Sequence, residues 1–366
     1  MRIRTVSAIV GGAAGLLGAA AAAGVARQVR TVARDRELIS PGSSAAFGAL
    51  PIDRQSVVQT GDGLALHAEE VGPAGAELTV VYVHGFTLNL GSFHFQRLAL
   101  TEAFGDRVRQ VFYDQRSHGR SQHSPAETST IEQTGRDLYS VLEQLVPTGP
   151  MVLIGHSMGG MTVMALASQH PELFSADGRI GAVVLINTSS GDLRNISLGL
   201  PNALARLHGP VLPLVLRRAA KNAKLVERGR ALGKDLAWVV TKRLSFADPD
   251  VDPAVVAYCT QMIAATSVAV VADFYHTLVA HDGRLGLRNL LERPVLVIGA
   301  DSDAMTPGAH SERIAQALPH ARLLMVPKSG HLLMMEHPEL VNVALLPVIE
   351  SALAAGTKSV KAGRRR

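Results

Sequence analysis

Short apolar runs, separated by longer amphipathic stretches, recur along residues 53–355. Runs of this length without polar alternation are typical of strands buried on both faces of a parallel sheet. Two further segments, residues 56–59 and 64–70, flank a turn sequence at residues 60–63 that holds two glycines, and they predict a hairpin. The six apolar runs are residues 78–83, 108–113, 151–154, 182–186, 295–298 and 323–326.

Amphipathic helical patterns lie between most of these runs. Ser129 and Glu132 have the spacing of a capping box, which predicts a helix running toward residue 146. Residues 158–169 and 338–354 have helical periodicity as well. Strands that alternate with helices predict an α/β fold, with a mostly parallel central sheet and helices on both faces.

The alternation is interrupted over residues 189–286, where the pattern is mostly helical and no sheet strand is evident. We interpret this stretch as a helical insertion between two strands. The α/β core then consists of residues 53–188 and 287–355. Residues 37–52, rich in Ser, Gly, Ala and Pro, are interpreted as a linker, and residues 356–366 as a basic tail.

Residues 1–36 form a separate N-terminal segment with a basic flank. Residues 6–26 carry no charge and are long enough to cross a hydrocarbon core of about 30 Å as a helix. An uncleaved membrane anchor is the favoured interpretation, and a signal peptide cleaved near Ala21 or Ala23, or a soluble tail, are the alternatives. The four arginines within residues 27–36 outnumber the two that precede the apolar stretch, which favours a domain facing the cytoplasm. We therefore expect membrane association, with secretion after cleavage as the alternative.

The composition is that of a folded chain with a basic surface. Hydrophobic residues make up 47% of the 366 positions and charged residues 18%, a balance that excludes extensive disorder. The net charge of +5 fits contact with an anionic membrane surface. No zinc-finger spacing or mixed aromatic and basic motif favours nucleic-acid binding. Cys259 is the only cysteine, so an intrachain disulfide is excluded.

The most specific motif is G-H-S-M-G at residues 155–159, between the apolar run 151–154 and a helical pattern. On its own the motif would also fit a glycine-rich turn. At a strand–helix junction, however, G-x-S-x-G is typical of a nucleophile elbow, in which a sharp turn exposes the serine hydroxyl. The small residues on either side allow the backbones of strand and helix to approach closely. Ser157 is therefore the candidate nucleophile.

A serine nucleophile needs a base, and the base needs a carboxylate to orient it. His331 is the candidate base because it follows the last apolar run, and the order serine, acid, histidine is that of elbow enzymes. Asp301 and Asp303 both follow the apolar run 295–298, and either can supply the carboxylate. We favour Asp303, which stands four residues before Pro307, where a helix is expected to begin.

Attack on an acyl carbonyl also needs hydrogen-bond donors for the tetrahedral oxyanion. In an elbow architecture these donors are backbone N–H groups, one after the nucleophile and one after an early central strand. We assign them to Met158, the residue after the serine, and to Phe86, which follows His84-Gly85 at the end of the apolar run 78–83.

Together these motifs resemble the α/β-hydrolase superfamily over about residues 56–354, in the form of a capped serine esterase or lipase. One motif is similar to the family's D-x-R-G-x-G-x-S loop, with Ser117 where glycine is usual, which puts only the local turn in doubt. The resemblance implies that residues 189–286 form a cap over the site, and it implies no metal and no organic cofactor. The motifs are H-G-F at residues 84–86, D-Q-R-S-H-G-R-S at 114–121, G-H-S-M-G-G at 155–160 and G-H at 330–331.

The resemblance favours an acyl hydrolase of the esterase or lipase type that works through an acyl-serine. Epoxide hydrolases and haloalkane dehalogenases of this fold use an aspartate at the elbow, so Ser157 excludes them. Thioesterase, amidase, carbon–carbon hydrolase, acyltransferase and cofactor-free haloperoxidase reactions use the same three residues and remain alternatives. A non-catalytic ligand-binding protein is a more distant alternative.

A substrate hint comes from the first half of the insertion. The apolar residues 200–216 overlap a strongly basic stretch, residues 201–243. They fit either a flap that rests on a membrane surface and admits a lipid-like chain, or helices that pack on the core with a solvated basic face. The expected partners are therefore a small acyl substrate, lipid-like in the first interpretation, and a membrane surface. Nucleic acid is not an expected partner.

Overall fold

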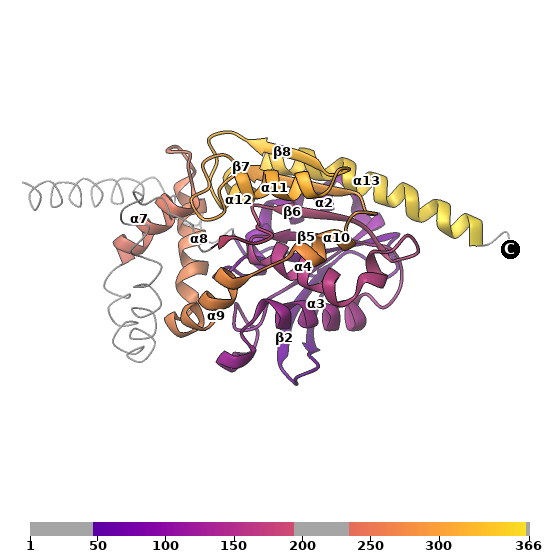
Figure 1. Ribbon diagram of the computed structural model, residues 1–366, viewed down its shortest axis with the longest axis horizontal. Helices are drawn as coiled ribbons and strands as arrows, with labels where there is room; N and C mark the ends of the chain where they lie inside the picture. The colour runs from indigo at the N-terminus through magenta and orange to yellow at the C-terminus, as the bar shows by residue number, and fades with distance from the viewer. Residues whose placement is uncertain (1–46, 194–233, 364–366) are drawn as a thin grey trace, which may run out of the picture.

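The computed structural model describes residues 47–193 and 234–363 (Figure 1). Its sheet has eight strands in the order β1-β2-β4-β3-β5-β6-β7-β8. The pairs β1–β2 and β2–β4 are antiparallel, and the other five pairs are parallel. The mostly parallel sheet and the first hairpin are as predicted. The strands are β1 (Arg54–Gln59), β2 (Ala65–Val71), β3 (Leu78–Val83), β4 (Val108–Tyr113), β5 (Met151–His156), β6 (Ile180–Ile186), β7 (Val295–Ala300) and β8 (Arg322–Val326).

Most of the apolar runs are continuous because the central strands are buried on both faces. In β3, Val80 and Tyr82 enter one core cluster, while Val81 and Val83 enter the other. The first cluster lies under α2 (His94–Phe104), α12 (Leu333–Glu336) and α13 (Pro338–Gly363). The second lies under α3 (Ile131–Leu145), α4 (Met158–Gln169), α10 (Arg284–Asn289) and α11 (Ala309–Ala317).

Three more helices stand between β6 and β7 in the chain: α7 (Lys234–Ser245), α8 (Pro253–Ala265) and α9 (Val268–Ala280). They lie together at one end of the sheet, on the left of Figure 1, and α13 extends away at the opposite end. We call these three helices the cap helices, because they lie within residues 189–286, for which the sequence predicts a cap. Trp238 and Met262 of the cap helices are buried in the first core cluster, so they serve packing. The expected anchor and most of the basic flap fall within residues 1–46 and 194–233, outside the described residues.

Two local predictions were wrong by small amounts. The N-cap of α3 is Thr130, whose side chain accepts a hydrogen bond from the Gln133 N–H, so the capping box with Ser129 does not form. Ser129 instead ends the preceding turn, and its hydroxyl bonds the Pro125 carbonyl. The helix expected to begin at Pro307 begins at Ala309.

Helix α13 is apolar enough to pass a length and hydropathy test for a membrane span over Pro338–Gly356, with a mean hydropathy of 1.5. Burial explains part of this composition, since Val341, Leu345 and Ile349 pack in the first core cluster, but Leu340 and Val343 are exposed. Helices α8 and α9 pass the same test only as a pair, with an 89° bend between them. In the described part of the chain, these helices are weak evidence for a membrane-spanning segment.

Candidate active site

The turn between β5 and α4 holds Ser157 in a conformation that L-residues rarely adopt, with φ 51° and ψ −118°. The neighbouring glycines make this turn sterically possible. A Cβ at Gly159 would lie 1.9 Å from the Val83 carbonyl oxygen, and a Cβ at Gly155 would lie 2.7 Å from the Gly160 nitrogen. The strand, turn and helix therefore close together only because both positions lack a side chain, and this is the geometry that the motif predicts.

The structure brings Ser157, His331 and Asp303, the candidate triad, into one hydrogen-bonded row. The Ser157 Oγ lies 2.9 Å from His331 Nε2, and His331 Nδ1 lies 2.7 Å from Asp303 Oδ2. An ionised carboxylate only accepts hydrogen bonds, so Nδ1 carries the proton and Nε2 presents its lone pair to the serine hydroxyl. All three side chains are buried, with Ser157 8% exposed.

The carboxylate of Asp303 is held by four hydrogen bonds. Its Oδ1 accepts from the backbone N–H groups of Met305 and Thr306, and its Oδ2 accepts from the Thr306 hydroxyl and from His331. Burial alone raises the pKa of Asp303, but the electrostatic interaction with His331 and these hydrogen bonds more than offset burial and lower the pKa below its usual value. The group is therefore ionised and suited to hold an imidazolium.

Asp301, the other aspartate considered from sequence, has a different environment. It is exposed, and its Oδ1 accepts from the Lys328 backbone N–H at 2.8 Å and from the Ser302 hydroxyl at 2.7 Å. It thus ties the loop after β7 to the loop after β8. Of the two aspartates, the structure places Asp303 and not Asp301 against His331.

Two buried residues hold the backbone of His331, and sequence reasoning gave neither of them a role. The Asn187 amide donates to the carbonyls of Gly330 and His331, at 2.9 and 3.0 Å. His156 Nε2 donates to the same His331 carbonyl at 2.9 Å. Burial, and next to it the electrostatic interaction with His331, lowers the pKa of His156 to about 3, so this ring is a neutral donor. Only its place inside the elbow motif could have pointed to His156, and no local signal marks Asn187.

The two assigned oxyanion donors lie at the start of α4 and in the loop after β3. Met158 is the first residue of α4, a position whose N–H has no partner within the helix. Phe86 lies in the loop after β3. Among the described residues, its N–H donates no loop or turn hydrogen bond to a backbone carbonyl. The Gln115 backbone N–H donates to His84 Nε2, and the Gln115 side-chain amide donates to the His84 carbonyl. These two hydrogen bonds fix the start of this loop.

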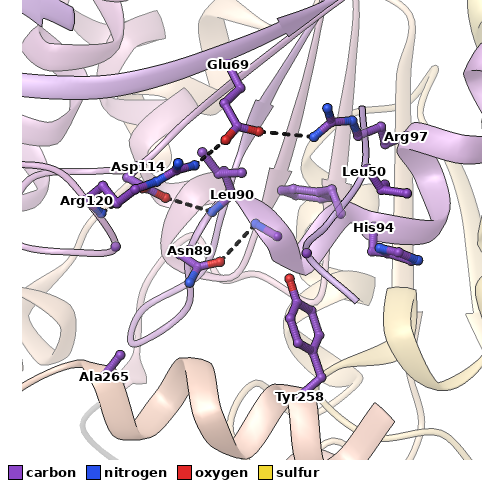
Figure 2. Close-up of a pocket in the computed structure, with 14 residues that line it drawn as sticks. Leu50, Glu69, Asn89, Leu90, His94, Arg97, Asp114, Arg120, Tyr258 and Ala265 are labelled. Atoms are coloured by element: carbon purple, nitrogen blue, oxygen red, sulfur yellow. Dashed lines mark hydrogen bonds and ion pairs between the residues drawn. The ribbon is translucent and has the colours of Figure 1, made fainter. Parts of the chain in front are cut away.

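The end of the same loop, at Asn89 and Leu90, borders a cavity of about 310 Å³ (Figure 2). Asp114 accepts from the Leu90 N–H, and the Asn89 side chain accepts from the Gly91 N–H, so the loop is held at its end as well. Tyr258 of α8 forms another wall, and its hydroxyl lies where a side chain at Gly91 would stand. The cap helices therefore rest directly on the loop that carries Phe86.

The charges of this cavity are balanced within its own walls. Glu69 pairs with both Arg97 and Arg120 (Figure 2). Burial raises the pKa of Glu69, but the neighbouring His67 ring and the two arginines outweigh it and lower the pKa to about 2. No member of the candidate triad lines the cavity. We therefore regard it as a support for the loop and not as the reaction site.

The turn at Ser117 shows how this chain accommodates a serine where the family's loop has glycine. Its φ is 65°, in the left-handed region where glycine is favoured. The serine hydroxyl accepts a hydrogen bond from the Ser124 N–H at 2.9 Å, which offsets part of the conformational cost. The turn is therefore kept without the glycine. Within residues 47–193 and 234–363, no three His, Cys, Asp or Glu side chains form a group that could hold a metal ion.

The chain is similar to several known hydrolases in sequence and in fold. A putative carbamate hydrolase, RutD, of Caulobacter sp. (strain K31) is 28% identical over 306 residues, which are 81% of this chain and 98% of that protein. The sn-1-specific diacylglycerol lipase ABHD11 of Mus musculus is 40% identical over 94 residues, 26% of this chain and 29% of that protein. A thermophilic esterase from Thermogutta terrifontis superposes with a TM-score of 0.62 and 25% identity, over 82% of this chain and 99% of that one.

The family model for the alpha/beta hydrolase fold matches residues 79–338, which include all three residues of the candidate triad. The relatives support an enzyme with hydrolase or esterase-like activity. Since the match spans well over half of the chain and the sheet has the expected order, this protein belongs to the α/β-hydrolase family.

Proposed function

We propose that this protein is a serine hydrolase that cleaves an ester through an acyl-serine. The observation that carries the proposal is the row Ser157–His331–Asp303, with distances of 2.9 and 2.7 Å. Such a row activates a hydroxyl whose own acidity is too low for attack at neutral pH.

In the proposed reaction, the Ser157 oxygen attacks the ester carbonyl carbon while His331 Nε2 takes the hydroxyl proton. The carbonyl oxygen becomes an oxyanion, which accepts hydrogen bonds from the N–H groups of Phe86 and Met158. The intermediate collapses, and His331 returns the proton to the departing alkoxide. Water then repeats the sequence on the acyl-serine and releases a carboxylic acid. Asp303 keeps the imidazole oriented and stabilises its charged form throughout.

The surroundings of the oxyanion donors favour an apolar acyl group. Phe86 and Met158 belong to a third apolar cluster, which also contains Met161 of α4 and Val270 and Phe274 of α9. An acyl chain entering between α4 and α9 would replace these contacts and bury its own surface, at about 25 cal/mol per Å². The partial similarity to a diacylglycerol lipase supports a lipid-like ester as the substrate.

The first test is labelling with a fluorophosphonate probe, which reacts with a serine activated by its base. We expect the native chain to be labelled and the Ser157→Ala variant to remain unlabelled. A series of p-nitrophenyl esters of increasing chain length then measures acyl preference. The corresponding thioester and anilide test for thioesterase and amidase activity. A native chain that is folded but is neither labelled nor active would contradict the proposal and favour a ligand-binding role.

We also propose that residues 6–26 attach the enzyme to a membrane. Their lack of charge and their length support a spanning helix, while the net charge of +5 supports only a peripheral contact. Extraction of membranes separates the two. An anchored chain stays in the membrane at high salt and leaves only with detergent, whereas release by salt alone would exclude the anchor.

A further inference from the structure

Glu336, at the end of α12, joins the loop of His331 to the cap helices. One carboxylate oxygen accepts hydrogen bonds from the backbone N–H groups of Ala247 and Asp248, at 2.7 and 2.6 Å. The other oxygen accepts from the Gly330 N–H at 2.6 Å. Ala247 and Asp248 follow α7, so one half-buried side chain binds two segments that are more than 80 residues apart in the chain.

The same two segments touch directly on both sides of His331. The Leu332 N–H donates to the Ser245 carbonyl at 2.9 Å. A Cβ at Gly330 would lie 2.7 Å from the Cα of Phe246, so glycine is needed for this close approach. The residues before and after His331 are thus both fixed to the end of α7, and Glu336 closes the connection.

We infer that Glu336 is a positioning residue for the reaction, which sets the place of His331 according to the position of the cap helices. The inference rests on the proposed function. A carboxylate suits this role because both of its oxygens accept, so it can satisfy three N–H groups from two directions. The amide of glutamine offers one accepting oxygen and would turn its NH₂ toward an N–H group of one segment.

The expected consequence concerns the distance between His331 Nε2 and Ser157 Oγ, which is 2.9 Å when the connection is intact. Proton transfer depends steeply on this distance, and a misplacement of about 1 Å can reduce the rate by about 100-fold. Displacement of the end of α7 would therefore switch off the base without any change at Ser157, Asp303 or the oxyanion donors.

The test compares Glu336→Gln with Glu339→Gln, an exposed glutamate one turn later, as the matched control. We expect Glu336→Gln to lower kcat and the rate of fluorophosphonate labelling by about 10- to 100-fold while KM stays within about twofold. The control should keep native values for kcat and labelling. A folded Glu336→Gln variant with native kcat and labelling rate would overturn the inference, even if its melting temperature falls.

A second measurement separates this inference from the proposed function. The proton on His331 Nδ1 gives a downfield resonance in NMR spectra, which reports the hydrogen bond to Asp303 whether or not the protein hydrolyses esters. We expect the resonance to shift or broaden in Glu336→Gln and to be unchanged in Glu339→Gln. An unchanged resonance in both would overturn the inference, and an inert native chain would overturn only the proposed function.

If Glu336→Gln does not fold, Gly330→Ala tests the same connection sterically. Its Cβ must push the backbone at Phe246 away from the loop. We expect the same loss of kcat with little change in KM, and native kcat in this variant would overturn the inference.

Discussion

Ser157 and His331 lie on two loops that are held in different ways. The elbow at Ser157 is fixed by backbone packing, since Gly155 and Gly159 let β5, α4 and β3 touch. The loop of His331 is fixed by side-chain hydrogen bonds that reach it from β5, the end of β6 and α12. A change at the elbow should therefore damage the fold, whereas a change around the loop of His331 should damage the reaction first.

The largest expected effect concerns the carboxylate at His331. Asp303→Asn should lower kcat by about 10⁴-fold with little loss of stability, because the amide favours the wrong tautomer of the imidazole. Asp301→Asn, two residues earlier, is the matched control and should keep kcat within about twofold. Steady-state kinetics on a p-nitrophenyl ester measures both. Equal losses in the two variants would show that the loop as a whole, and not Asp303, supports the base.

Acid should weaken the elbow side of the site. Burial lowers the pKa of His84 to about 4 and the pKa of His118 and His156 to about 3. Below pH 6.5 the unfolded chain binds protons that the folded chain does not, so stability is full above this pH and falls as the pH drops toward the folded values. Each histidine contributes about 1.4 kcal/mol per pH unit. These three histidines alone should lower the free energy of unfolding in urea by about 4 kcal/mol between pH 7.5 and pH 5.5, and equal free energies at the two pH values would refute this account.

A methyl group added at the elbow should lower the stability of the fold more than it lowers the catalytic rate. Gly159→Ala places a Cβ on the Val83 carbonyl oxygen, which is backbone and cannot rotate away. We expect the free energy of unfolding to fall by about 3 kcal/mol or more. Gly61→Ala is the control, because a Cβ there meets nothing within 4 Å. Urea denaturation measures the free energy of unfolding of both variants. A Gly159→Ala chain as stable as the control would show that a Cβ is tolerated at this position.

The smallest expected effect is at the hydrogen bonds behind His331. Asn187→Gly keeps the φ of 40° accessible but removes both donors to the loop. We expect kcat to fall by about tenfold, in line with the loss of one or two net hydrogen bonds. Thr306→Val removes the hydroxyl on Asp303 and should act similarly. Activity that survives in both variants would place the control of His331 elsewhere in the loop.

The same contrast explains how far sequence reasoning could go. The buried strands and the elbow are encoded locally, by apolar runs and by closely spaced glycines, so they were predicted with nearly correct bounds. The support of His331 depends on residues that meet only after folding, as Asn187 and Gly330 do across 143 positions. The roles of Thr306 and Glu336 also depend on tertiary contacts. The choice of Thr130 rather than Ser129 as the N-cap depends on single backbone angles. No periodicity in the sequence reveals them.

The two loops also differ in when they are made. Ser157 and His331 are 174 residues apart. At about 5 to 20 residues per second, a ribosome needs roughly 10 to 35 s to travel from the nucleophile to its base. During that interval the elbow has no histidine to activate its serine, and β7, β8 and α13 have not yet covered their share of the core. The order of the chain would therefore delay the proposed hydrolytic activity until His331 has been synthesised.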